Sequence, residues 1–286
     1  MKTTFTTKIA ALNIAAHRHT NSDTYERILS DAFSIRQPIK LRGDRHALLR
    51  SISPYTESGK IVGFGGSIVT FIDIDKNDKW YNLSKSKEAD DSEVQEQIAI
   101  PENLKLKPKF FDFYFDLMSH TFAFTKDNRG NSLSPLTLKS YFDQLFQHPA
   151  FSRYESIEVT VIQEPETLEK IWRLLKINKL EIYVARPNSP GDVERAIYKK
   201  LEDNHAQDMQ TTYRHNAGES LQPTEQVKQE SKVALKNGFV KASGRDVHNK
   251  PVTLSTEQHP TILPAEYKSG QNLSDLIRSI VSKFTE

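Results

Sequence analysis

The feature that most constrains the fold is a succession of strand and helix patterns over residues 157–201. Residues 157–162 and 180–185 are rich in apolar and β-branched side chains, which is typical of strands. Pro165 begins a segment whose apolar residues recur at helical spacing, and Ser189-Pro190 begins a second one that ends at Leu201. This order of strand, helix, strand and helix predicts a split βαβ unit packed against a sheet.

The rest of the chain also mixes the two patterns. Helices are expected after residue 22, capped by Asn21 or Ser22, from Ser134-Pro135, and over the apolar repeat at residues 273–284. The polar residues 205–229 predict a linker. Further strands are expected at residues 5–16, 47–52, 61–73 and 252–255, and a hairpin at residues 110–116 and 121–125.

We therefore expect an α+β fold made of two mixed α/β domains. The first spans residues 1–150, and the second spans residues 151–286 and contains the split βαβ unit on an antiparallel sheet. The C-terminal helix has an apolar face that suits either docking within the chain or a dimer interface.

Composition narrows the class of protein. The 286 residues include no cysteine, which excludes disulfides, thiolate metal sites and cysteine nucleophiles. No apolar run approaches the roughly 20 residues that span a bilayer, and Asn13 interrupts the short apolar patch near the N-terminus, unlike in a signal peptide. These features favour a cytoplasmic protein without membrane association.

Positive charge is concentrated near the start of the chain. The net charge of +2 is too small to indicate a nucleic-acid partner, but residues 1–50 contain nine lysines and arginines against four acidic residues. Such a cluster is typical of a solvated face, and at this density it also suits contacts with phosphates. Within residues 36–50 the cations are Arg36, Lys40, Arg42, Arg45 and Arg50, with His46 beside them and Asp44 as the one acid.

A second basic segment lies at residues 231–245. Asn237-Gly238 lies between two short alternating runs, which predicts a β-hairpin with a two-residue turn. The same dipeptide also suits the left-handed end of a helix, because residues 224–236 are rich in helix-forming residues. Both interpretations leave a basic stripe that suits a phosphate backbone, while exposed lysines also protect strand edges. Its members are Lys232, Lys236, Phe239, Lys241 and Arg245.

Motifs for catalysis or cofactors are not convincing. Residues 73–78 begin like a calcium loop, but Asp78 stands where an EF-hand needs glycine and Ser84 where it needs glutamate. The glycines at residues 63–66 lie within strand-forming residues, so they predict a bulge or close backbone approach rather than a phosphate loop. His17 and His19 lack further metal ligands. We assign no catalytic residue, metal or cofactor.

Two blocks of sequence resemble known families. The segments RGDRHALL, FIDIDKNDKWYNL and FFDFYFDLMSHTFAF resemble an uncharacterised bacterial family of unknown function that also occurs in mobile elements. Residues 157–267, with LEIYVARP, DVERAIYKKL and FVKASGRD, resemble in layout the phage Rex exclusion protein A family. That resemblance implies dimeric DNA binding without sequence preference, acting in phage exclusion. It places Lys241 at a basic site, while Ser243 occupies the second basic position, where Lys236 or Arg245 would have to substitute.

The combined interpretation is a homodimer that binds DNA through its phosphate backbone in phage exclusion or a related mobile-element role. The two basic segments would form its contact surfaces. One alternative is a scaffold or neutralising partner of a phage or host protein, acting through the C-terminal helix and residues 110–115. A second alternative is a metal-dependent nuclease that gathers Asp73, Asp75 and Asp112.

Overall fold

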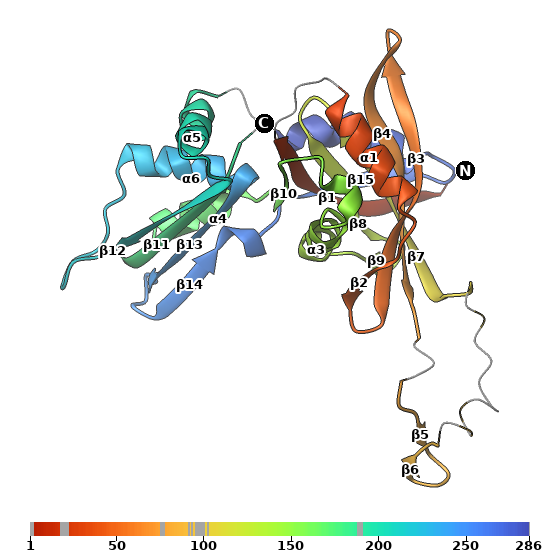
Figure 1. Ribbon diagram of the computed structural model, residues 1–286. Coiled ribbons are helices and arrows are strands. Elements are labelled where there is room, and N and C mark those ends of the chain that lie inside the picture. Colours follow the sequence, from red (N-terminus) through yellow and green to blue (C-terminus); the bar gives the residue numbers. More distant parts are fainter. Residues whose placement is uncertain are drawn as a thin grey trace.

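The computed structural model describes residues 3–17, 23–74, 78–90, 92, 94, 101, 103–187 and 191–285. Its strands form a nine-stranded and a four-stranded sheet, both antiparallel, which lie beside each other with helices packed against them (Figure 1). A separate two-stranded sheet pairs β5 (Tyr81–Asn82) with β6 (Lys87–Glu88). The expected α+β class is confirmed.

The nine-stranded sheet is built around β1 (Thr4–His17), which pairs with β8 along one edge. On the other edge of β1, β10 pairs with its second half and β15 with its first half. The main order is β10-β1-β8-β7-β4-β3-β2, with β9 beside β8. The remaining bounds are β2 (Ile39–Arg42), β3 (Arg45–Glu57), β4 (Lys60–Ile72), β7 (Leu106–Asp116), β8 (Thr121–Asn128), β9 (Asn131–Ser132), β10 (Ser156–Val161) and β15 (Ile262–Lys268).

Helices cover both faces of this sheet because its strands carry apolar side chains on both sides. Along β7, Phe111, Phe113 and Phe115 lie in the core under α1 (Thr24–Ser34) and α3 (Pro135–Leu145). Tyr114 points to the opposite face, where it packs with Ile277 of α7 (Leu273–Ile280). The 3₁₀ helix η3 (Val281–Phe284) continues α7 and buries Phe284 in the same core.

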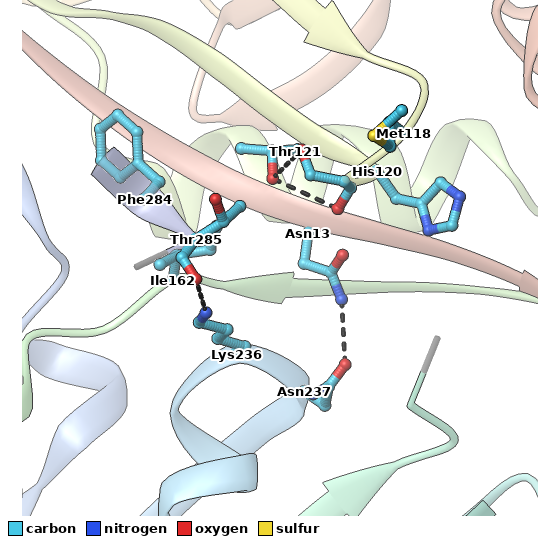
Figure 2. Close-up of a pocket in the computed structure, with 10 residues that line it drawn as sticks. Asn13, Met118, His120, Thr121, Ile162, Lys236, Asn237, Phe284 and Thr285 are labelled. Atoms are coloured by element: carbon cyan, nitrogen blue, oxygen red, sulfur yellow. Dashed lines mark hydrogen bonds between the residues drawn. The ribbon is translucent and has the colours of Figure 1, made fainter. Parts of the chain in front are cut away.

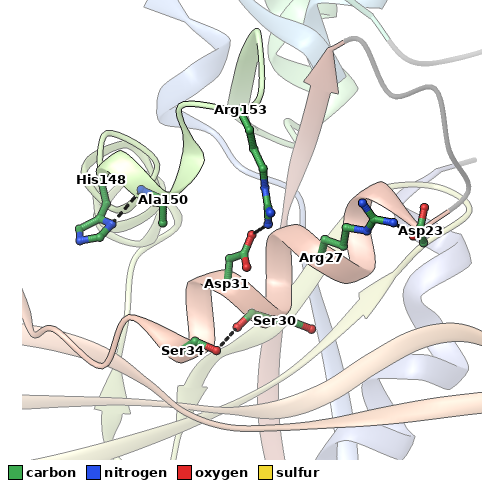
Figure 3. A network of polar contacts seen from close by, with 8 residues as sticks. All are labelled: Asp23, Arg27, Ser30, Asp31, Ser34, His148, Ala150 and Arg153. Carbon is green, nitrogen blue, oxygen red and sulfur yellow. Dashed lines mark hydrogen bonds and ion pairs between the residues drawn. The ribbon is translucent and has the colours of Figure 1, made fainter.

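Polar contacts fix α1 against the loop that leads from α3 to β10, as Figure 3 shows. Asp31 of α1 forms an ion pair with Arg153. The loop contains the short 3₁₀ helix η1 (Pro149–Phe151), whose start is capped where the Ala150 backbone N–H donates to His148 Nδ1 at 3.2 Å. The residue before the first turn of α1 is Asp23, and the expected caps, Asn21 and Ser22, lie outside the described residues.

The four-stranded sheet has the order β12-β11-β13-β14. Its inward residues, such as Leu180, Ile182 and Val240, form a separate core with the helices on one face. The outward residues of the same strands face solvent. The elements are α4 (Pro165–Trp172), β11 (Lys176–Ala185), α5 (Asp192–Asp203), β12 (Asp208–Arg214), α6 (Glu225–Asn237), β13 (Gly238–Arg245) and β14 (Pro251–Ser255), followed by the 3₁₀ helix η2 (Thr256–Gln258).

Most expected strands and helices are present, but their assembly differs in three places. The strands that flank α4 belong to different sheets, because β10 pairs with β1 while β11 lies in the four-stranded sheet. The expected linker at residues 205–229 contains strand β12 and the beginning of α6. Residues beyond 150 supply β10, β15 and α7 to the first sheet, so the two sheets are not confined to residues 1–150 and 151–286.

The expected hairpin at residues 231–245 is wrong. Residues up to Asn237 form the end of α6, and Gly238 begins β13 directly. Gly238 has φ 171° and ψ −133°, which is extended rather than left-handed backbone. Glycine is needed here for another reason, since a Cβ at this position would lie 1.9 Å from the backbone oxygen of Tyr183. Close approach of two strands, not turn geometry, explains the Asn-Gly sequence.

The glycines at residues 63–66 lie within β4, as expected for close backbone approach. A Cβ on Gly66 would lie 2.0 Å from the backbone oxygen of Ser51, and one on Gly63 would lie 2.3 Å from the Tyr114 hydroxyl oxygen. Among the described residues, no helix combines the length and apolar composition needed to cross a membrane.

Candidate nucleic-acid interface

The outward surface of the four-stranded sheet, here called the open face, collects side chains from all four strands. Antiparallel pairing places Tyr183 between Gln210 and Phe239 in one row, and Glu181 between Thr212 and Lys241 in the next. The following row continues with Arg214, Lys179, Ser243 and Thr253, and then Arg245 lies opposite Pro251. The open face comprises Lys179, Glu181, Tyr183, Gln210, Thr212, Arg214, Phe239, Lys241, Ser243, Arg245, Thr253 and Ser255.

An aromatic pair occupies the two central strands of the open face. The rings of Tyr183 and Phe239 are stacked, with centroids 5.2 Å apart and planes 20° from parallel. Their neighbours Val184 and Val240 point the other way and are fully buried in the helix-covered core. Both rings are partly exposed, and neither packs into that core. The alternation along β11 and β13 thus directs two π surfaces outward.

Cations follow the aromatic pair along the strands, on the side away from the first sheet, with Lys241 in the next row, Lys179 and Arg214 in the row after it, and Arg245 beyond. Lys241 and Arg245 on β13 and Arg214 on β12 are exposed. Arg245 donates from Nη1 to the backbone oxygen of Asn249 at 2.8 Å, which leaves its other nitrogens available. Lys179 lies 2.7 Å from the carboxylate of Glu181. Along these rows Lys179, Arg214, Lys241 and Arg245 outnumber Glu181, which gives this part of the open face a positive field.

The opposite end of the aromatic pair is acidic. Burial and the negative charge of Asp208 raise the pKa of Tyr183, whose hydroxyl donates a hydrogen bond to that carboxylate. Glu158 on β10 and Asp143 on α3 also act on Tyr183. Burial, followed by repulsion from Asp208 and Asp143, raises the pKa of Glu158. The open face therefore has a basic end and an acidic end, and the acidic end lies toward the first sheet.

Two of the sequence-predicted residues lie away from this face. Lys232 and Lys236 are on α6, which packs on the opposite side of the sheet from Lys241. Lys232 is exposed, while Lys236 is half-buried and donates from Nζ to the backbone oxygen of Thr285 at 2.5 Å. Burial lowers the pKa of Lys236. The structure thus divides the expected basic stripe, leaving Phe239, Lys241 and Arg245 together on the open face.

Lys236 lines a cavity of about 300 Å³ at the junction of the two sheets (Figure 2). There, Asn13 of β1 donates from Nδ2 to Oδ1 of Asn237 at 3.2 Å. Next to it, Gln163 donates from Nε2 to the backbone oxygen of Gly238 at 2.5 Å. These contacts attach the end of α6 and the start of β13 to the first sheet, so the residues of this junction have a structural role.

The basic residues 36–50 do not form one surface. Arg36 lies over the ring of Phe33 at 3.9 Å, and Lys40 and Arg42 are exposed around the turn that joins β2 to β3. Arg45 donates to Thr70 at 3.3 Å and Arg50 to Ser67 at 3.3 Å. Since residues 67 and 70 are three apart on β4, these arginines extend to opposite faces of the sheet.

The two basic segments are separated by α3. This helix packs against both β10 and β2, and Gln144 donates from Nε2 to the backbone oxygen of Lys40 at 3.2 Å. In the view of Figure 1 the β2–β3 turn and the end of β14 project to the same side, with α3 between them. The acidic end of the open face also lies on this side, at Asp143 of α3. A single continuous basic surface is therefore absent from the described residues.

The carboxylates of the nuclease alternative are not gathered into one site. Asp73 forms an ion pair with Lys105 at 2.5 Å. Asp112 is the strand partner of Ser67, and Ser67 precedes Asp73 by six residues. Asp112 and Asp73 are therefore separated by about 20 Å along the strand direction. Burial raises the pKa of Asp112 despite the nearby Arg50. Asp75 lies outside the described residues, as does His19 of the histidine pair.

The two elements expected to bind a partner protein, the C-terminal helix and residues 110–115, pack mainly within the chain. Ile277, Val281 and Phe284 are buried against the first sheet. Along β7, the inward phenylalanines are fully buried, while the outward Phe110 is 46% exposed and has Arg50 at 5.0 Å from its ring. Neither element presents a broad apolar face to a partner.

The sequence prediction included strands at β11 and β14 but not at β12, and it did not assign the outward residues of β11 to the site. The signal was present in β11, where Lys179, Glu181 and Tyr183 alternate with the buried Leu180 and Ile182. Strand β12 was missed because only Met209 and Tyr213 are clearly apolar among its inward residues, so the segment has the composition of a loop.

A family model described as a domain of unknown function (DUF4747) matches residues 5–282. The match covers both segments in which resemblances were noted, and it confirms the expected membership of an uncharacterised family of unknown function. No curated protein matches this chain.

Proposed function

The chain belongs to the DUF4747 family, whose description assigns no activity, and we propose from its open face that it is a sequence-independent nucleic-acid-binding protein. The observation that carries this proposal is the stacked Tyr183–Phe239 pair on a surface that continues along the strands to the exposed Lys241, Arg214 and Arg245. Basic side chains bind any phosphate backbone, and flat aromatic rings tolerate any base.

The composition of the open face supports contact without sequence preference. Its cations come from strands rather than from a helix that could enter a major groove. Its hydroxyl residues, Thr212, Ser243 and Thr253, are short donors suited to phosphate oxygens. The DNA-binding role expected from the sequence is thus retained, with its contact surface reduced to the residues of the open face.

The roles in phage exclusion or a related mobile-element function remain predictions based on the Rex-like resemblance. A dimer also remains a prediction. The α7 face is already buried against the first sheet, so a dimer would have to form through another surface.

A fluorescence polarisation titration tests the proposal. Labelled oligonucleotides of several sequences, single-stranded and duplex, are titrated with the full chain at about 50 and about 200 mM salt. We expect affinity to fall at least tenfold between these conditions, equally for all sequences. Absence of binding at the lower salt concentration would contradict the proposal.

Charge variants locate the contact. Lys241→Gln and Arg245→Gln should each weaken binding severalfold and reduce the salt slope by about one. Lys199→Gln is the control, because Lys199 is also exposed but lies on α5, on the other side of the sheet. Equal effects of all three variants would assign the binding to general charge rather than to the open face.

A further inference from the structure

We propose that the open face takes single-stranded nucleic acid, with a base stacked on the Tyr183–Phe239 pair and the adjacent backbone on Lys241 and Arg245. This inference rests on the proposed function and names its substrate class. It begins from the position of the two rings, which lie outside the helix-covered core and are partly exposed on a sheet surface.

The rings distinguish between the two forms of nucleic acid. In a duplex the faces of the bases are stacked on each other and unavailable to side chains, whereas an unpaired strand can place a base face against an aromatic ring. A surface built only for a duplex needs cations but gains nothing from an outward aromatic pair. Here Phe239 and Lys241 lie on the same face of one strand, two residues and about 7 Å apart.

Charge gives the bound strand a direction across the sheet. Beyond Tyr183, the carboxylates of Asp208, Glu158 and Asp143 repel a phosphate backbone. On the other side, Lys241, Arg245 and Arg214 attract it. A base on the aromatic pair is therefore at the end of the basic surface, and the backbone continues from it over β13 and β14 rather than toward α3.

Helices do not cover the open face within the described part of the chain. The helices α5 and α6 pack on the buried face through residues such as Ile197, Ala234 and Leu235. Gln210, opposite Tyr183, is exposed, and so are Thr212 and Thr253 in the rows farther along the edge strands. A strand of several nucleotides can lie across it without displacing any element.

The test separates stacking from charge. Phe239→Leu removes the ring, and Phe239→Tyr is its control because it keeps a ring in the same place. We expect Phe239→Leu to weaken binding of single strands of about 16 nucleotides roughly tenfold. Phe239→Tyr should bind as the unmodified chain does. Both variants should leave the weaker duplex binding unchanged, and thermal unfolding checks that each is folded.

Separate DNA and RNA single strands show which backbone is preferred, and binding to either supports the proposal. Tighter binding to duplex than to single strands, or single-strand binding unaffected by Phe239→Leu, would overturn it. In that case the salt-dependent loss with Lys241→Gln would still uphold nucleic-acid binding itself. Failure to bind any nucleic acid at low salt would overturn both.

Discussion

At the scale of single residues, Gly238 shows how one position can be read in two ways from sequence. Asn-Gly is a strong hairpin signal because both residues tolerate positive φ. In the structure Gly238 is extended, and its lack of a side chain lets β13 approach Tyr183 on β11. Asn237 is buried and bonded to Asn13 and to the backbone oxygen of Val233. Both residues serve packing between distant segments, which no local pattern reveals.

Gly238→Ala should therefore lower the free energy of unfolding by about 1–3 kcal/mol, because the new Cβ would overlap the Tyr183 backbone oxygen. Chemical denaturation followed by circular dichroism measures the change. Gly191→Ala is a suitable control, since the Cβ there meets only the movable carboxylate of Glu194. A loss at Gly238 no larger than that at Gly191 would refute this role.

At the scale of elements, sequence predicted those whose apolar pattern is complete and local. The helix α3 follows from Ser134-Pro135 and from the helical spacing of its buried residues, and the β7–β8 hairpin follows from alternation along β7. Residues 225–237 were harder, because Val233 and Leu235 suit a strand while the whole segment suits a helix. Packing of α6 on β11 and β13 decides between the two.

The same limit applies to the candidate site. Phe239, Lys241 and Arg245 were recognised from one strand, but Tyr183 and Arg214 come from strands that pair only in the folded chain. Periodicity indicates that a strand exists without naming its neighbour. For that reason β10, expected in the same sheet as β11, was wrongly placed, and it pairs with β1 of the other sheet instead.

Strand β10 supplies a prediction that depends on pH. Because burial and nearby acids raise the folded-state pKa of Glu158, its ionised form opposes folding above its unfolded-state pKa. Glu158→Gln should therefore increase stability at neutral pH. The advantage should shrink as the pH falls through the raised pKa, since the folded carboxyl then binds its proton. Urea unfolding at neutral and mildly acidic pH measures both differences, and a constant advantage would contradict this cause.

At the scale of the whole molecule, the chain joins a sheet covered on both faces to a sheet covered on one. The first sheet buries its two faces under α1, α3 and α7, so its strands serve mainly as a core. The second leaves one face open and arranges aromatic, basic and hydroxyl side chains across it. The junction holds the two together through Gln163 and the end of α6. We therefore expect the function to reside on the open face of the second sheet.

The most direct test of this account is photocrosslinking of a single strand that contains bromouracil, followed by mass spectrometry of the crosslinked peptides. Stacked aromatic side chains should react first, so the account predicts crosslinks at Tyr183 or Phe239, in peptides of β11 and β13. These crosslinks should decrease in Lys241→Gln and persist in Lys199→Gln. Crosslinks confined to the β2–β3 turn or to α6, with none on β11 or β13, would contradict the central claim.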